Sequence, residues 1–486
     1  MLYIGIDLGT SAVKLLLMDE TGNIKKIVSR EYPLSFPNPG WAEQDPEEWL
    51  TKTIDGIREL VFECDRDKVA GISFGGQMHG LVVLDANDNV IRPAILWNDG
   101  RTAEETDYLN LVIGKEKISE YTSNIAFAGF TAPKLLWMEK NEPENFKKIN
   151  KIMLPKDYLV YMLSGSFSTE VSDASGLLLM DVKNRKWSEE MLEICHITEN
   201  QLPKLYESYE AVGNLKPEMA KITGLNENVK IIAGAGDNAA AAVGTGNVEA
   251  GTCNISVGTS GTIFIPTNTS VVDKNNALHS FAHAAGNYHL MGVVMSAASC
   301  NKWWCEEILK TKDFAAEQAD INKLGDNNVF FLPYLMGERS PHNDTDVRAM
   351  FIGMSMDTER AEMTQAVLEG VAFGFRDSFE IAKSLGIEIK SATICGGGAK
   401  SMLWKRIIAN VLNISVKKTE STEGPALGAA ILATVGCGEY KSVQEACEKI
   451  VRVTDTLEPE ADLVQKYNGK YEKYKKLYPA IKNLYK

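Results

Sequence analysis

Apolar and polar positions alternate over residues 2–34 in three runs, separated by the turn-forming sequences LGTS and ETGN. A period of two is typical of β-strands, so this segment predicts a three-stranded antiparallel meander. The next segment, DPEEWLTKTIDGIRELVFEC, predicts a helix, and Asp45, Pro46 and Glu48 suit its first turn. Further strands are predicted at VAGISFG, LVVLD and VIRPAILW, with the loop GQMHG between the first two.

A second hairpin with a Gly-Thr-Ser turn is predicted downstream, at GTCNISVGTSGTIFIP. Two halves that each begin with such a hairpin indicate an internal duplication or a coincidence, and the repeat is too short to decide. It places a domain boundary near residues 244–251, so we predict domains over 1–247 and 248–486. Later, SATICGGGAKSMLWKRIIANVL predicts a strand, a glycine loop and a helix. The small residues of EGPALGAAILATVGCG predict a helix that can approach another helix closely, and this helix is a candidate hinge.

Composition excludes several classes of protein. The chain has 486 residues, enough for two or three domains, and 51 basic against 65 acidic residues give a net charge of −14. With no basic block, we expect no nucleic-acid partner. No apolar run approaches the ~18 residues of a membrane span, and the first residues do not follow a signal-peptide pattern. We therefore expect a cytoplasmic protein without a membrane partner, whose eight scattered cysteines are reduced thiols.

The first candidate for chemistry is the turn after the first strand, where Asp7 precedes Gly9, Thr10 and Ser11. Backbone N–H groups and hydroxyls in such a turn can bind phosphate oxygens, and the carboxylate can hold the accompanying magnesium ion. A plain hairpin with an aspartate bonded to its own backbone gives the same pattern. The signal is therefore weak when it stands alone.

Three other segments carry similar weak signals. The stretch AGAGDNAAAAVGTG places Asp237 before a predicted helix, where it can serve as an N-cap or as a functional carboxylate. The run GGGAKS lacks the order of a Walker A loop. Gly258 and Thr259 in the second Gly-Thr-Ser turn are candidate phosphate contacts. Gly396, Gly397 and Gly398 are candidates for close approach to a nucleotide, although a bare glycine run is more often a tight turn.

The order of these motifs, closed by the small-residue helix, resembles the actin-like ATPase superfamily and, within it, the FGGY carbohydrate kinases, up to about residue 436. The segments GWAEQDPEEW, GGQMHGLVVLD, ILWNDGRT, GFTAPKLLW, LPKDYL, SDASG and GERSPHN are similar to the xylulokinase group of that family. The resemblance implies an α/β fold with two ribonuclease H-like (actin/hexokinase-like ATPase) domains facing across a cleft. Sugar would bind mainly to the first domain and ATP mainly to the second, and the implied reaction is Mg²⁺- and ATP-dependent phosphorylation of D-xylulose.

The resemblance also implies roles for individual residues. Asp237 matches the catalytic aspartate, which would accept the proton of the sugar hydroxyl, and Asp7 would act through magnesium; both are expected near the metal. Met78 and His79 match the substrate loop and argue against glycerol. Trp97 can offer an apolar face to the sugar. By itself, His79 is more readily interpreted as a structural histidine, but its place in a loop between two strands, before Gly80, favours a functional role. Trp97 is equally interpretable as a core residue, and Glu43 and Gln44 stay unassigned.

Two alternatives remain open. The first is a related kinase for another ketose, polyol or aldonate, such as ribulose or gluconate, because a few hydrogen bonds can decide between similar sugars. The second is an actin-like ATP-binding protein that phosphorylates no sugar. A homodimer is implied by the resemblance alone. The tail places Tyr467, Tyr471, Tyr474 and Tyr478 at helical spacing, either as a partner-binding stripe or, as we favour, packed on its own domain.

Overall fold

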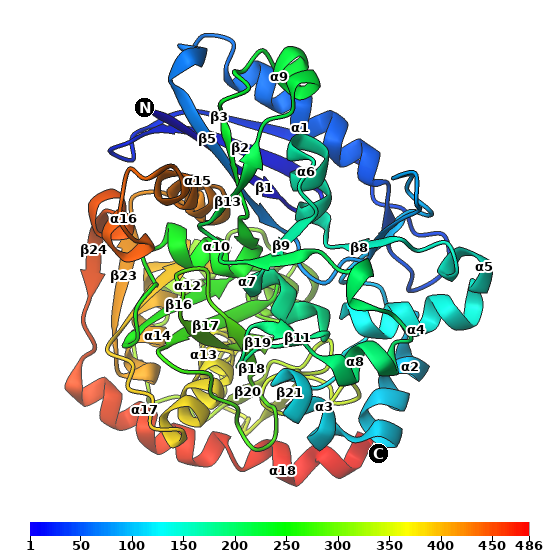
Figure 1. The fold of residues 1–486 in the computed structure, drawn as a ribbon. Helices are drawn as coiled ribbons and strands as arrows, with labels where there is room; N and C mark the ends of the chain where they lie inside the picture. The colour runs from blue at the N-terminus through cyan, green and yellow to red at the C-terminus, as the bar shows by residue number, and fades with distance from the viewer. Residues whose placement is uncertain (486) are drawn as a thin grey trace.

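The computed structural model describes residues 1–485, which form two seven-stranded mixed sheets. The first sheet has the order β13-β14-β5-β1-β2-β3, with β15 paired to β5 (Figure 1). The predicted three-stranded meander is confirmed, since β2 is antiparallel to both β1 and β3. The strands of this sheet are β1 (Leu2–Leu8), β2 (Ala12–Asp19), β3 (Ile24–Glu31), β5 (Val69–Gly76), β13 (Ala211–Asn214), β14 (Lys230–Ile232) and β15 (Ala235–Gly236).

The second sheet repeats the plan of the first. Its order is β18-β19-β17-β16-β22-β23-β24, and in both sheets an antiparallel hairpin is followed by two strands parallel to its first strand. The two Gly-Thr-Ser turns thus occupy equivalent places, as an internal duplication requires, and the ribonuclease H-like fold class is confirmed. The strands are β16 (Thr252–Val257), β17 (Gly261–Thr267), β18 (His279–Ala282), β19 (Tyr288–Val294), β22 (Ser391–Cys395), β23 (Ser415–Thr419) and β24 (Val453–Leu457).

The central strand β1 is covered on both faces. Ile4, Ile6 and Leu8 pack with α1 (Pro46–Leu60) and α6 (Pro155–Ser164), whereas Tyr3 faces α10 (Asp237–Gly244) and α15 (Gly424–Cys437). Burial on both sides explains why this strand is more apolar than a half-exposed one. In Figure 1, α15 lies beneath the first sheet although it comes from the last part of the chain.

The predicted close approach of the small-residue helix is confirmed. A Cβ on Gly428 would lie 1.8 Å from the carbonyl oxygen of Ala240 in α10, and one on Gly244 would lie 2.0 Å from that of Gly424. Only glycine allows such a distance between helix backbones. Since α15 seals the first sheet, residues late in the chain belong to the core of its first half, and the division at 247 and 248 stays a prediction.

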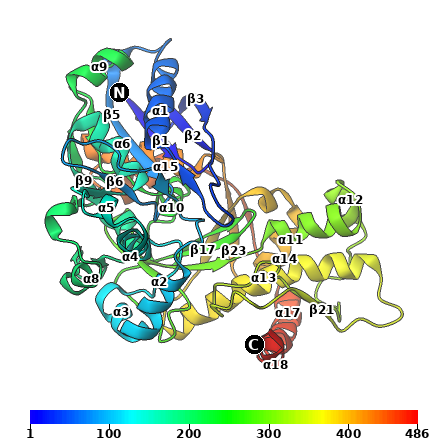
Figure 2. The same cartoon turned by 90° about the vertical axis from the view of Figure 1, so that its right-hand side faces the viewer.

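The tail packs on its own half of the molecule, the alternative that we favoured. Tyr467 donates to Glu369 (3.0 Å) and Tyr471 to Asp377 (2.6 Å), both on α13 (Arg360–Ser384). The two views place the C-terminus at the opposite end of the molecule from the N-terminus (Figures 1 and 2). Within residues 1–485, no helix is both long and apolar enough to cross a membrane.

The remaining elements are mostly short and surround the two sheets. The helices are α2 (Ala103–Asp107), α3 (Lys115–Thr122), α4 (Thr131–Asn141), α5 (Pro143–Phe146), α7 (Val171–Ala174), α8 (Glu189–Ile194), α9 (Pro217–Thr223), α11 (Ala298–Lys302), α12 (Phe314–Ala319), α13 (Arg360–Ser384), α14 (Met402–Leu412), α16 (Val443–Ile450), α17 (Ala461–Tyr474) and α18 (Leu477–Ile481). The short strands are β4 (Glu43–Gln44), β6 (Val82–Leu84), β7 (Ala94–Ile95), β8 (Lys151–Met153), β9 (Ser168–Glu170), β10 (Met180–Asp181), β11 (Lys186–Trp187), β12 (Lys204–Tyr206), β20 (Phe330–Leu332) and β21 (Met350–Ile352).

Candidate active site

Strand register brings three of the sequence motifs to one edge of the first sheet. Strands β1, β5 and β15 are parallel, with Asp7 opposite Gly75 and Gly75 opposite Ala235. The segments that follow these strands therefore leave the sheet at the same edge. They are the turn with Thr10, the loop with Met78 and His79, and the start of α10 at Asp237.

The two aspartates at this edge influence each other. Burial and the charge of Asp237 raise the pKa of Asp7 to about 7. Burial raises the pKa of Asp237 to about 6, although the backbone N–H of Asn238 (2.6 Å) and its amide (2.9 Å) both donate to Oδ1. Two desolvated carboxylates that repel each other suit a divalent cation, because Mg²⁺ is commonly bound by one or two carboxylates together with phosphate oxygens.

Asp237 does not cap its helix, so that alternative interpretation was wrong. The N-cap of α10 is Gly236, and Asp237 is the first helical residue. Its side chain instead lines a cavity of about 220 Å³ between the two halves of the chain. The other residues around this cavity are Asn238, Ala241, Thr245, Asn254, Ser256, Cys395, Gly396, Ser421, Thr422, Gly424 and Pro425, most of which the sequence motifs had not singled out.

The turn with Thr10 is held by neighbouring side chains. The indole N–H of Trp97 donates to Thr10 Oγ1 (2.9 Å), and the amide of Gln44 donates to the Thr10 carbonyl oxygen (2.7 Å). Because Oγ1 already accepts a hydrogen bond, the Thr10 hydroxyl can donate to a ligand. Trp97 is 45% exposed, so it is no core residue, and Ser11 is exposed at the tip of the turn.

The second turn is anchored in the other sheet. The carbonyl oxygens of Gly258 and Thr259 accept from the backbone N–H groups of Ala298 (2.8 Å) and Ala297 (3.0 Å), at the start of α11. Thr259 and Ser260, at the tip of the turn, are exposed, so a ligand can reach them.

Packing within the chain explains two of the three consecutive glycines. Gly396 has a φ of 87°, and a Cβ there would lie 2.7 Å from the backbone of Val257. A Cβ on Gly398 would lie 2.4 Å from the Val257 side chain, whereas one on Gly397 would meet open space. Gly396 and Gly398 are thus required by contacts with Val257, whereas the space beside Gly397 is open to a ligand.

Within residues 1–485, one ring nitrogen of His79 has a hydrogen-bond partner and the other has none. Its Nδ1 lies 2.8 Å from the carbonyl oxygen of Gly176, which can only accept, so Nδ1 carries the hydrogen and Nε2 can accept. The ring stacks on Phe130 at 4.4 Å, and burial lowers the pKa of His79 to about 3, so the ring is neutral at pH 7. The backbone of His79 has a φ of 68°, and its carbonyl oxygen accepts from Lys134 Nζ (2.7 Å).

One short segment, around α7, connects His79 with the start of α10. Ser172 Oγ accepts from the Gly236 N–H (3.2 Å) and donates to Glu170 (3.0 Å), while Gly176 binds His79. Met78 completes the link, since a Cβ on Gly236 would lie 3.0 Å from its Sδ. The signal in the sequence was the motif SDASG, to which we had assigned no role.

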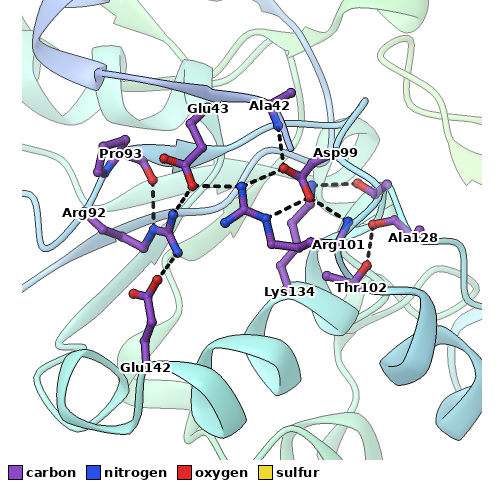
Figure 3. Close-up of polar contacts among 11 residues, drawn as sticks. Ala42, Glu43, Arg92, Pro93, Asp99, Arg101, Thr102, Ala128, Lys134 and Glu142 are labelled. Atoms are coloured by element: carbon purple, nitrogen blue, oxygen red, sulfur yellow. Dashed lines mark hydrogen bonds and ion pairs between the residues drawn. The ribbon is translucent and has the colours of Figure 1, made fainter. Parts of the chain in front are cut away.

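Figure 3 shows the network that accounts for Glu43. Glu43 forms ion pairs with Arg92 and Arg101 (2.8 Å to Arg101), and Arg101 also pairs with Asp99 (2.7 Å). The Arg101 guanidinium lies over the Trp41 ring at 3.7 Å, so the network is buried. It fixes strand β4 and thereby the adjacent residue, Gln44.

Gln44 joins the turn with Thr10 to the loop with Met78 and His79. Its Oε1 accepts from Gln77 Nε2 (3.1 Å), while its own amide donates to the Thr10 carbonyl oxygen. Gln77 directly precedes Met78, and its backbone N–H donates to Leu8 (2.9 Å). Gln44 is therefore a positioning residue, and no simple sequence pattern could have revealed its partners.

Known proteins match the chain over most of its length. The N-terminal domain model of the FGGY family of carbohydrate kinases matches residues 2–244, and its C-terminal domain model matches residues 253–437. The chain is 40% identical over 486 residues to the xylulose kinase of Escherichia coli (strain K12), covering 99% of each chain.

Two solved structures are similar over the whole chain. A structure described as a xyloylose kinase from Brucella ovis superposes with a TM-score of 0.95 at 40% identity, covering 100% of each chain. A gluconate kinase from Lactobacillus acidophilus gives a TM-score of 0.95 at 27% identity, covering 100% of this chain and 99% of the other.

Proposed function

The chain belongs to the FGGY family of carbohydrate kinases, and from this premise we propose that it transfers the γ-phosphoryl group of ATP to D-xylulose, giving D-xylulose 5-phosphate. Its similarity to a xylulose kinase over the full length supports this substrate. The observation that carries the proposal is the placement of Met78 and His79, with a free acceptor at His79 Nε2, beside Asp237 at one edge of the first sheet.

Asp237 would orient the attacking hydroxyl and accept its proton. Phosphoryl transfer passes through a loose transition state, so the protein contributes mainly position and charge. The proton becomes acidic late, as the oxygen bonds to phosphorus, and a carboxylate is then a sufficient base. Its raised pKa, about 6, brings Asp237 closer to the working pH than an exposed aspartate, and such a base typically contributes ~10²- to 10⁴-fold.

Asp7 and Asp237 are the residues that would hold Mg²⁺, which neutralises charge on the ATP phosphates when it is bound. Thr10 and Ser11 would bind these phosphates from one wall and Gly258 and Thr259 from the other, since hydroxyls and turn N–H groups donate to anions. The nucleotide would pass close to Gly396, Gly397 and Gly398, and the open space at Gly397 would leave room for it. Trp97 would border the sugar and hold the Thr10 hydroxyl in place.

The main alternative is phosphorylation of an aldonate or another ketose. The similarity to a gluconate kinase at 27% identity favours it as the second candidate. A non-catalytic ATP-binding protein would have no use for Met78, His79 and Asp237 at one edge. A cytoplasmic location and a homodimer are also part of the proposal.

The proposal predicts ADP release from MgATP that depends on the sugar. We would compare kcat/KM for D-xylulose, L-ribulose, D-ribulose, D-gluconate, glycerol and no sugar, and we expect D-xylulose to be preferred.

Asp237→Asn should keep the fold and nucleotide binding but lower kcat by at least ~10²-fold. Preference for another sugar would move the substrate assignment, and an Asp237→Asn enzyme within tenfold of wild type would refute the role of the base.

A further inference from the structure

The loop with Met78 and His79 faces a group of side chains from the second half of the chain, which we call the wall. His279 and Phe281 project from the same face of the edge strand β18. The ring of Phe281 lies 6.4 Å from that of His79, and the ring of His279 lies 5.6 Å from that of Phe130. Aromatic side chains from both halves therefore surround His79.

Arg339, from the segment GERSP, belongs to the same wall. Its guanidinium lies over the Phe127 ring at 5.0 Å, and Phe127 contacts both Phe130 (5.4 Å) and His279 (5.1 Å). Within residues 1–485, the guanidinium forms no ion pair and no hydrogen bond. A guanidinium has five N–H donors, and because Arg339 is half-buried, these donors are left to water or to a ligand.

The carboxylate next to Arg339 does not neutralise it. Glu338 Oε1 accepts from the backbone N–H groups of Met295 (2.8 Å) and Arg339 (2.9 Å). Burial raises the pKa of Glu338 to about 8, so this group is mostly uncharged at pH 7. The positive charge of Arg339 is therefore available to a ligand.

His279 also lacks a partner. It is 4% exposed, and among the described residues neither of its ring nitrogens forms a hydrogen bond. Burial and the neighbouring charge of Arg339 lower its pKa well below the usual range, which leaves the ring neutral, with one donor and one acceptor. With His79 Nε2, three polar groups that have no hydrogen-bond partner within residues 1–485 thus lie along one aromatic wall. His79 and Arg339 are only half-buried, so a ligand can reach them.

We propose that Arg339 and His279 bind the carbonyl end of the open-chain sugar, opposite the hydroxyl that faces Asp237. This inference rests on the proposed function. A ketone oxygen only accepts hydrogen bonds and a guanidinium only donates them, so the two are complementary. The second half of the chain would thus supply specificity to a site that the sequence motifs assign to the first half.

The proposal extends to a second class of ligand. A five-carbon aldonate carries a carboxylate where the ketose carries its carbonyl end, and a charged, partly desolvated guanidinium binds carboxylates strongly. D-Xylonate should therefore bind the same site, competing with D-xylulose, and more tightly than the uncharged polyol xylitol.

The test measures binding and turnover of three variants of the full chain. Arg339→Gln should raise KM for D-xylulose at least tenfold and leave KM for ATP within twofold. It should also abolish the preference for D-xylonate over xylitol in calorimetric titrations, whereas Arg339→Lys keeps part of it. His279→Asn should raise KM for the sugar alone. The matched control is Arg348→Gln, because the Arg348 guanidinium is exposed and donates to the carbonyl oxygens of Thr345 and Val347.

Two results would overturn the inference. One is a KM for D-xylulose within twofold of wild type in folded Arg339→Gln; the other is wild-type protein that binds D-xylonate no more tightly than xylitol. The second needs no variant, so it decides even if Arg339→Gln does not fold. A wild-type protein that binds D-xylonate but releases no ADP with any sugar would instead refute the proposed function alone.

Discussion

At the scale of single residues, burial decides which groups carry charge. It leaves His79 neutral, with a pKa of about 3, and holds the pKa of Asp237 at about 6, so neither has its solution behaviour. Glu338 is the extreme case among the carboxyls discussed here, with a pKa of about 8. Such shifts make the stability of the protein depend on pH.

Glu338→Gln should stabilise the protein relative to wild type as the pH rises. The folded state holds the Glu338 proton more tightly than the unfolded state, so the contribution of Glu338 is complete below about pH 4.5 and is lost as the pH rises towards about 8. Glutamine keeps an acceptor and does not titrate. We expect the difference in Tm, variant minus wild type, to grow between pH 5 and pH 8; a difference that is constant over this range would contradict the assignment.

At the scale of elements, the contact between α10 and α15 is decisive, because it joins the start of the candidate active site to the last part of the chain. The helices approach so closely that Gly428 has no room for a Cβ beside Ala240. Backbone atoms cannot move aside as a flexible side chain can. The small residues that the sequence concentrates in this helix are therefore a packing requirement.

Gly428→Ala should lower the free energy of unfolding by about 1 to 3 kcal/mol, the usual cost of overpacking a core. Gly469→Ala is the matched control, since Gly469 lies in α17 with nothing within 4 Å of a Cβ. There the better helix propensity of alanine should raise stability by up to about 1 kcal/mol. Denaturant unfolding of both variants measures whether the two changes in the free energy of unfolding have opposite signs. Equal changes in the two variants would refute the packing argument.

At the scale of the whole molecule, ligands should hold the two halves together. The cavity beside Asp237 is lined by both, with Asn254 and Cys395 from the second sheet. A ligand at 100 times its Kd stabilises a folded protein by about 2.7 kcal/mol. We expect D-xylulose and a non-hydrolysable ATP analogue together to raise Tm more than either alone. A sugar shift that disappears when the nucleotide is present would mean that the two compete.

The amino-acid sequence was sufficient to predict the secondary structure around the candidate site. The meander, both Gly-Thr-Ser hairpins and the small-residue helix depend on local periodicity and on glycine, so the sequence was enough to predict them. The order of the motifs indicated the family, and the resemblance singled out Asp237, Met78 and His79, whose roles stay predictions. The local pattern allowed Asp237 to be the N-cap of its helix, but the N-cap of α10 is Gly236 and Asp237 is the first helical residue.

The contacts between distant groups could be established only from the folded chain. The hydrogen bond from Gln44 to Thr10, the link from Gly176 to His79 and the approach of Arg339 to Phe127 join residues from 34 to 212 positions apart. The sequence pattern records each residue's exposure and turn preference but not its distant partner. The protonation of a buried group and the number of its unpaired donors depend on those distant partners. The sequence could therefore locate the candidate site, but the charges in the site and the wall with His279 and Arg339 depend on how the chain folds.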